Sequence, residues 1–242
     1  PHIMGPAQAK ALSGLTSVAD WIGSGPYFED PSVEWETAVS RALDNAGFIS
    51  PIYRENLSFE EIFGFIPNET QSVFASKIDG PGIYVLEAPP GLGKTEAALF
   101  VGYNLLQSGQ ASGIYFALPT QLTSNKIHER FDSFLEKILM PESRINQHSM
   151  LLHGSAWLLD SFEMGVEGQP GQSWFNQKKR GLLAKFGVGT LDQALMAAMN
   201  VKHGFVRAFG LAGKVVILDE VHTYDEYTGS ILDSLIRLLE QL

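Results

Sequence analysis

Residues 87–96, Glu87-Ala88-Pro89-Pro90-Gly91-Leu92-Gly93-Lys94-Thr95-Glu96, decide the fold of this chain because they form the pattern of a phosphate-binding loop. The apolar, β-favouring run Gly82–Leu86 before the loop predicts a buried strand, and Ala97–Val101 after it begin a helix. The two glycines let backbone N–H groups turn toward phosphate oxygens at the positive end of that helix. We expect the Lys94 ammonium to reach the β- and γ-phosphates of a nucleotide and the Thr95 hydroxyl to bind Mg²⁺.

The candidate nucleotide-binding residues of the loop are Pro90, Gly91, Leu92, Gly93, Lys94, Thr95 and Glu96. Ala88 stands where the strict pattern has glycine, and this variant is the form that superfamily 2 helicases favour. The alternative is a Gly/Pro turn that precedes Lys-Thr without binding phosphate.

A second motif, Lys214–His222, makes the turn alternative improbable. Its apolar half predicts a buried parallel strand, and the strand ends in Asp219 and Glu220. In this class of site, the aspartate holds Mg²⁺ and the adjacent glutamate polarises the water that attacks the γ-phosphate. His222 would sense the nucleotide and transmit its state to whatever packs across the cleft. Solvated acids at a strand end remain the alternative when this motif is taken alone.

Composition describes an ordinary globular protein. The 242 residues include 45% hydrophobic and 18% charged residues, and no run is as long as the ~18 apolar residues that a membrane span needs. The absence of cysteine excludes disulfides and zinc–thiolate sites and fits a cytoplasmic location. A net charge of −10 argues against a broad basic face for nucleic acid, although a narrow groove lined by amides and hydroxyls remains possible.

The N-terminal residues differ in character from the rest of the chain. Residues 1–9 have the composition of an expression-vector remnant and a disordered start. Residues 10–50 predict two helices, Ala9–Gly23 and Trp35–Ala46, that resemble the end of an upstream helical domain with its linker. Asp20 is a candidate metal ligand there, and a capping or surface acid is the alternative.

Gln71 is the candidate for nucleobase recognition. A glutamine amide can accept from adenine N6 and donate to N7, and the aromatic residues that precede Gln71 could stack on the base. Its distance from the loop is that of the helicase Q motif. The alternative is a surface glutamine after a turn.

The rest of residues 51–242 alternates between strands and helices. Strands are predicted at Ser112–Leu118, Ser149–His153 and Phe186–Gly189, and helices at Gln121–Leu139, Leu191–Met199 and Asp225–Leu242. With the two motif strands, this order predicts an α/β fold: a five-stranded, P-loop (RecA-like) parallel sheet with helices on both faces. Ligands should bind at the carboxyl ends of the strands.

Two loops at that edge are candidates for gripping nucleic acid. They offer hydroxyls, amides and helix starts to a phosphate backbone, with ordinary helix capping as the alternative. The candidate residues are Pro119, Thr120, Gln121 and Asn125 in the first loop and Gly189, Thr190, Asp192 and Gln193 in the second. The Gly-rich span Gly154–Gly181 could be a lid, a wedge or a partner surface, and its basic run Lys178–Arg180 is more typical of a solvated turn.

Together these motifs resemble the CRISPR-associated helicase–nucleases of type I systems, which belong to superfamily 2 and carry a DExH box. The resemblance extends from Leu12 to Leu242. The most specific segments are Ala88–Leu99, Leu118–Gln121, Leu152–Gly154, Val188–Leu195 and Asp219–Tyr227. In this light, the segment around Asp20 is similar to the last metal-binding stretch of the family's HD nuclease domain, without its histidines.

The resemblance implies an ATP-hydrolysing translocase that uses Mg²⁺ and pulls single-stranded DNA, recruited to a target-bound surveillance complex. The family's nuclease, which needs a divalent transition metal, would degrade this DNA. The chain would comprise the end of the nuclease domain (residues 10–50) and the first RecA-like domain (51–242), without the second RecA-like domain and its arginine finger. We therefore expect the chain alone to be monomeric and nearly inactive. Two alternatives remain open: another superfamily 2 DNA or RNA helicase, or a nucleotide-responsive docking module without turnover.

Overall fold

The computed structural model describes residues 5–30, 32–46, 48, 50–118, 124–144, 151–152, 182–221 and 225–242. Its elements follow one another in the order α1 (Pro6–Gly23), η1 (Pro26–Phe28), α2 (Trp35–Asn45), α3 (Phe59–Phe63), α4 (Glu69–Ser76), α5 (Lys94–Gln107), β1 (Gly113–Leu118), α6 (Ser124–Ile138), α7 (Pro141–Arg144), β2 (Leu151–Leu152), β3 (Phe186–Thr190), α11 (Leu191–Ala198), α12 (Gly204–Leu211), β4 (Lys214–Leu218) and α13 (Glu226–Glu240).

The described strands form one parallel sheet in the order β2-β3-β1-β4. The central strand β1 pairs with β3, where Ile114 lies opposite Phe186, and with β4, where Ala117 lies opposite Leu218. Every residue of β1 is buried, as expected for a parallel strand with helices on both faces. The parallel α/β architecture predicted from the sequence is therefore confirmed.

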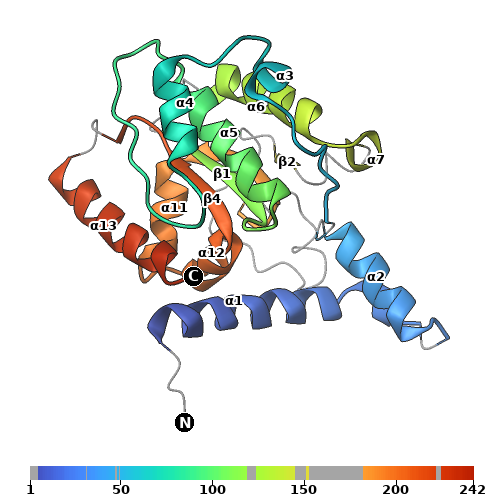
Figure 1. Ribbon diagram of the computed structural model, residues 1–242. Helices are drawn as coiled ribbons and strands as arrows, with labels where there is room; N and C mark the ends of the chain where they lie inside the picture. Colours follow the sequence, from blue (N-terminus) through green and yellow to red (C-terminus); the bar gives the residue numbers. More distant parts are fainter. Residues whose placement is uncertain are drawn as a thin grey trace.

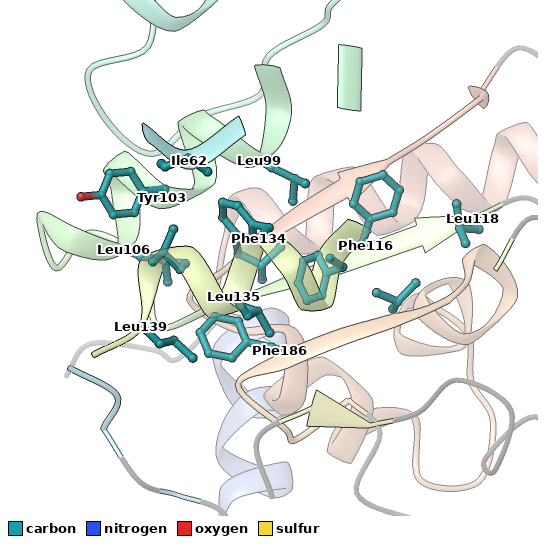
Figure 2. Close-up of a cluster of buried hydrophobic side chains, with 14 residues drawn as sticks. Ile62, Leu99, Tyr103, Leu106, Phe116, Leu118, Phe134, Leu135, Leu139 and Phe186 are labelled. Atoms are coloured by element: carbon teal, nitrogen blue, oxygen red, sulfur yellow. The ribbon is translucent and has the colours of Figure 1, made fainter. Parts of the chain in front are cut away.

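Alternating side chains of β1 divide the core into two layers, and helices cover both faces of the sheet (Figure 1). Ile114, Phe116 and Leu118 pack in one hydrophobic cluster with residues of α5, α6 and β3. Figure 2 shows this cluster, in which Leu99 and Phe134 approach the sheet from two different helices. Tyr115 and Ala117 belong to a second cluster with α11, α12 and α13. This two-residue period of a strand fixes which helices lie on each face.

One predicted strand is wrong. Residues 83–89 have no regular secondary structure, and the Val85 side chain is 85% exposed rather than buried. A strand needs a neighbour that accepts and donates its backbone hydrogen bonds, and none of the described strands lies beside this run. β4, which is paired with β1 on one side, has no second partner among the described residues. Local β-propensity alone is thus insufficient to form a strand here.

The other predicted elements within the described residues are confirmed, with ends that differ by a few residues. The first helix begins at Pro6 instead of Ala9, because proline is well suited to the first turn of a helix. Of the predicted strand Ser149–His153, only residues 151–152 are described, and they pair with β3.

The first helix lies against the body of the protein through α12 (Figure 1). Val18 and Ile22 of α1 share a cluster with Val206 of α12. Gly14 allows this contact, because a β-carbon at that position would collide with the Phe205 carbonyl oxygen and the Phe209 side chain. No helix in the part of the chain that the structure describes is both long enough and apolar enough to cross a membrane.

A lysine joins the beginnings of two strands on either side of β1. The Lys214 amine donates hydrogen bonds to the carbonyl oxygens of Leu182, at 2.6 Å, and Ala184. Burial of the amine, together with the nearby Lys185 ammonium, lowers the pKa of Lys214 from 10.5 to about 7. A neutral amine has two N–H groups, which match the two carbonyl acceptors.

We expect this lysine to make folding stability depend on pH. Between about pH 7 and pH 10 the unfolded chain holds a proton on Lys214 that the folded chain lacks, so the free energy of unfolding should rise with pH by up to about 1.4 kcal/mol per pH unit. Below pH 7 the charged amine is present in both states and carries its full burial cost. Urea unfolding of the wild type and of Lys214→Met between pH 6 and pH 9 tests this, and parallel curves for the two proteins would contradict it.

Candidate nucleotide-binding site

A cavity of about 390 Å³ lies at the carboxyl end of β4 and contains both sequence motifs. Its walls come from the segment before α4, the phosphate loop with the start of α5, one residue of α6, and the residues that follow β4. The lining residues are Phe65, Asn68, Gln71, Pro90, Gly91, Leu92, Gly93, Lys94, Thr95, Glu96, Arg130, Asp219 and Glu220. Residues far apart in sequence thus meet at the edge of the sheet where ligands were expected.

The phosphate loop has the backbone that its glycines predicted. Gly91 and Gly93 have φ angles of 82° and 71°, which residues with a β-carbon rarely adopt. Gly93 is also the N-cap of α5, so the helix begins at Lys94 with its positive dipole end at the cavity. The Lys94 ammonium donates to the Ala88 carbonyl oxygen at 2.7 Å and therefore lies folded across the loop.

Two amide side chains tie the start of α4 to this loop. Asn68 donates to the Leu92 carbonyl oxygen at 3.1 Å, and Gln71 donates to the Gly93 carbonyl oxygen at 3.0 Å. Asn68 and Gln71 also form a reciprocal capping box at the start of α4, with Gln71 accepting from the Asn68 backbone N–H. Gln71 lines the cavity as predicted, but it is 2% exposed and both ends of its amide are bonded within the protein. Adenine recognition by Gln71 remains a prediction and would require these bonds to exchange.

The two acids lie directly after β4. The Asp219 backbone N–H donates to the Ala117 carbonyl oxygen at 3.1 Å and so continues the pairing with β1. Glu220 has a φ of 54°, an uncommon backbone conformation for a residue with a side chain, and its N–H donates to the Asp219 carboxylate at 3.0 Å. Burial and the adjacent Glu220 raise the pKa of Asp219, while Lys94 and Arg130 oppose that rise.

An ion pair closes the side of the cavity beside the phosphate loop. Glu96, in the first turn of α5, accepts a hydrogen bond from the Arg130 guanidinium of α6. The Glu96 side chain is 11% exposed and the Arg130 side chain is 50% exposed. Glu96 was predicted to line the nucleotide site, and its partner in α6 was not predicted.

The donor groups of the site fit a hard divalent cation. The Thr95 hydroxyl and the Asp219 carboxylate line the same cavity, and Mg²⁺ prefers one or two such oxygens together with phosphates and water. In the described residues, no group of three or more His, Cys, Asp or Glu side chains forms an all-protein metal site. Asp20 lies exposed on α1, so its predicted role as a nuclease-site ligand remains a prediction.

The second predicted nucleic-acid loop is largely occupied by internal contacts. Gln193 is 3% exposed and accepts a hydrogen bond from Arg207 at 2.7 Å. Thr190 is the N-cap of α11 as predicted, but its side chain makes no capping bond and its carbonyl oxygen accepts from the buried Tyr115 hydroxyl. Gly189 is buried in β3, and Asp192 is exposed. The nucleic-acid role of all four remains a prediction, and the Gln193 side chain is not accessible in this conformation.

Several predicted residues lie outside the residues that the structure describes. They are Pro119, Thr120, Gln121, His222 and the whole span Gly154–Gly181. Asn125 belongs to α6, whose first residues have no described side chains.

Sequence reasoning missed two contributors to the cavity, Asn68 and Arg130. Asn68 could have been found, because Asn followed three residues later by Gln is a capping-box signature. Arg130 gives no such signal, because an arginine on the polar face of an amphipathic helix looks the same whether or not it meets a site.

The parallel sheet, the phosphate loop and the acidic pair after β4 define a RecA-like P-loop NTPase domain. No protein-family model matches the chain. It is 38% identical, over 98% of its length, to the CRISPR-associated endonuclease/helicase Cas3 of Thermus thermophilus, and 35% identical over the same share to the CRISPR-associated nuclease/helicase Cas3 of Streptococcus thermophilus. The chain is thus a homologue of the Cas3 helicase–nucleases and spans 28% of the length of each of these relatives.

Solved structures agree with this relationship. The chain superposes on T. fusca Cas3 with AMPPNP with a TM-score of 0.78 and 34% identity, over 99% of the chain and 29% of the other protein. For T. fusca Cas3 with ATP the TM-score is 0.77 at 32% identity, over 99% and 28% of the two chains. A chain of a CRISPR RNA-guided surveillance complex in a pre-nicking state matches with a TM-score of 0.57 and 29% identity, over 99% and 24%.

Proposed function

We propose that this chain binds ATP with Mg²⁺ in the cavity between the phosphate loop and Asp219-Glu220. We further propose that it forms the ATP-binding part of an ATP-dependent translocase for single-stranded DNA, which acts with a nuclease in CRISPR interference. The observation that carries the proposal is that Lys94, Thr95, Asp219 and Glu220, contributed by two distant segments, line one cavity.

Each residue has a distinct part in the proposed reaction. The helix start at Lys94 and the turned loop bind the phosphates, and Lys94 exchanges its contact with the Ala88 carbonyl for the β- and γ-phosphates. Thr95 and Asp219 would hold Mg²⁺, which supplies neutralisation of the phosphate charge. The Glu220 carboxylate orients the attacking water and accepts a hydrogen bond from it. His222 would couple this event to neighbouring parts of the protein.

The relatives support the wider proposal. Solved Cas3 structures contain ATP and AMPPNP, and the chain of a surveillance complex is among the matching structures. We therefore propose single-stranded DNA and a target-bound surveillance complex as partners, and residues 10–50 as the end of an HD nuclease domain. The cytoplasmic location remains a prediction.

Fluorescence titration with mant-ATP in the presence of Mg²⁺ tests nucleotide binding by the chain. We expect saturable binding that unlabelled ATP displaces better than GTP does, because the Gln71 amide suits adenine. Absence of saturation at millimolar nucleotide would contradict the proposal.

The two remaining alternatives are separated by turnover in a Cas3-length protein that contains this segment. Phosphate release stimulated by single-stranded DNA, and not by RNA, supports the DNA translocase, whereas stimulation by RNA supports another superfamily 2 helicase. Nucleotide binding without any phosphate release above a Glu220→Gln background would indicate a docking module.

A further inference from the structure

Beside the phosphate loop, Glu96 presents a carboxylate to a site that is proposed to bind a polyanion. It follows Lys94 and Thr95 in the first turn of α5, and a β-carbon built on Gly93 would lie 3.3 Å from Glu96 Oε2. The carboxylate therefore folds back toward the N-cap of its own helix. A carboxylate at this place interacts favourably with the helix dipole, but it repels an incoming phosphate.

Arg130 offsets that repulsion. Its guanidinium bonds to Glu96, and its positive charge also acts on Asp219, whose pKa it lowers against the effect of burial. Among the described residues that line the cavity, the charged ones are three carboxylates, Lys94 and Arg130. Without Arg130, Lys94 would be the one cationic side chain beside three carboxylates in the described lining of the cavity.

We propose that Arg130 is a positioning residue for nucleotide binding, which neutralises the Glu96 charge and fixes the position of its carboxylate by tying α5 to α6. The inference rests on the proposed binding of ATP at this cavity. It assigns Arg130 an indirect role, because its guanidinium donates to the Glu96 carboxylate.

A double-mutant cycle with mant-ATP and Mg²⁺ tests the inference in the full chain. Arg130→Ala leaves a largely buried carboxylate without its partner, so affinity should fall about tenfold or more. Glu96→Gln in the Arg130→Ala background should restore most of that loss, because the repelling charge is gone. Glu96→Gln alone should bind at least as tightly as the wild type, and Arg130→Lys, which keeps the positive charge, should lose less than Arg130→Ala.

All variants are compared at a temperature at which circular dichroism shows each of them to be folded, so that affinity is separated from stability. If Arg130→Ala proves unstable, the double variant and Arg130→Lys still carry the test, since the double variant is expected to retain most of the wild-type affinity and Arg130→Lys to lose less than about tenfold. An affinity as low in the double variant as in Arg130→Ala would mean that Arg130 contacts the phosphates directly and would overturn the inference. Unchanged affinity in a folded Arg130→Ala would overturn it as well. Binding by the wild type distinguishes these outcomes from failure of the proposed function, in which no protein of the set would bind.

Discussion

Lys94→Ala is expected to lower the affinity of the chain for Mg·ATP about 30- to 100-fold, which corresponds to about 2–3 kcal/mol for the loss of a hydrogen bond from a charged donor. Lys94 ends the phosphate loop and is the first residue of helix α5. Its ammonium would therefore lie beside phosphates bound at the start of that helix. ATP-dependent translocation by a Cas3-length protein should be lost entirely, because the charge that develops on the transferred phosphoryl group would have no lysine beside it.

Folding should survive this change. Lys94 is partly exposed, and among the described residues it donates only to carbonyl oxygens of the loop, at 2.7 Å and 3.5 Å. Calorimetric titration with a non-hydrolysable ATP analogue measures the affinity, and thermal melting provides the control. A large drop in melting temperature would show that Lys94 is a structural residue and that the assignment is wrong.

The second large effect concerns hydrolysis. Glu220→Gln is expected to reduce phosphate release by a Cas3-length protein by about 10²- to 10⁴-fold, the usual contribution of a general base, while leaving Mg·ATP binding within about threefold of the wild type. Asp219→Ala should instead weaken binding itself, and only in the presence of Mg²⁺, because it removes a proposed ligand of the ion.

Titration of both variants with a non-hydrolysable analogue, with and without Mg²⁺, separates these roles. The distinction rests on position: Asp219 is half-buried and continues the β1–β4 pairing, whereas Glu220 is exposed to the cavity. Equal losses of affinity in the two variants would remove the distinction. Loss of binding without Mg²⁺ in Asp219→Ala would instead indicate that the aspartate shapes the loop.

The motifs that define the site were readable in the sequence because each of them is contiguous. Gly91 and Gly93 supply the positive φ angles of the phosphate loop within a few residues, and Asp219-Glu220 follows its strand directly. Their chemistry depends on local backbone geometry, which short-range sequence patterns specify. The order of helices and strands was equally accessible, because each buried element carries its own hydrophobic periodicity.

The prediction of a strand at Gly82–Leu86 was wrong because a strand depends on residues that are distant in the sequence. Its apolar, β-branched composition suits a strand, but hydrogen bonds to a neighbouring strand decide whether one forms. The described sheet places β1 beside β4 and gives residues 82–86 no partner. A helix satisfies its own backbone and is therefore predicted more safely than a strand.

The sequence by itself determined the phosphate loop, the acidic pair and the parallel α/β order, because these follow from residues close together in the chain. Only the tertiary structure decided which side chains surround them. Gln71 reaches the Gly93 carbonyl across 22 residues, Arg130 meets Glu96 across 34, and Gln193 is withdrawn into a bond with Arg207. A polar side chain looks the same in the sequence whether it faces water, a ligand or another side chain, because its partner is fixed by the packing of helices against the sheet.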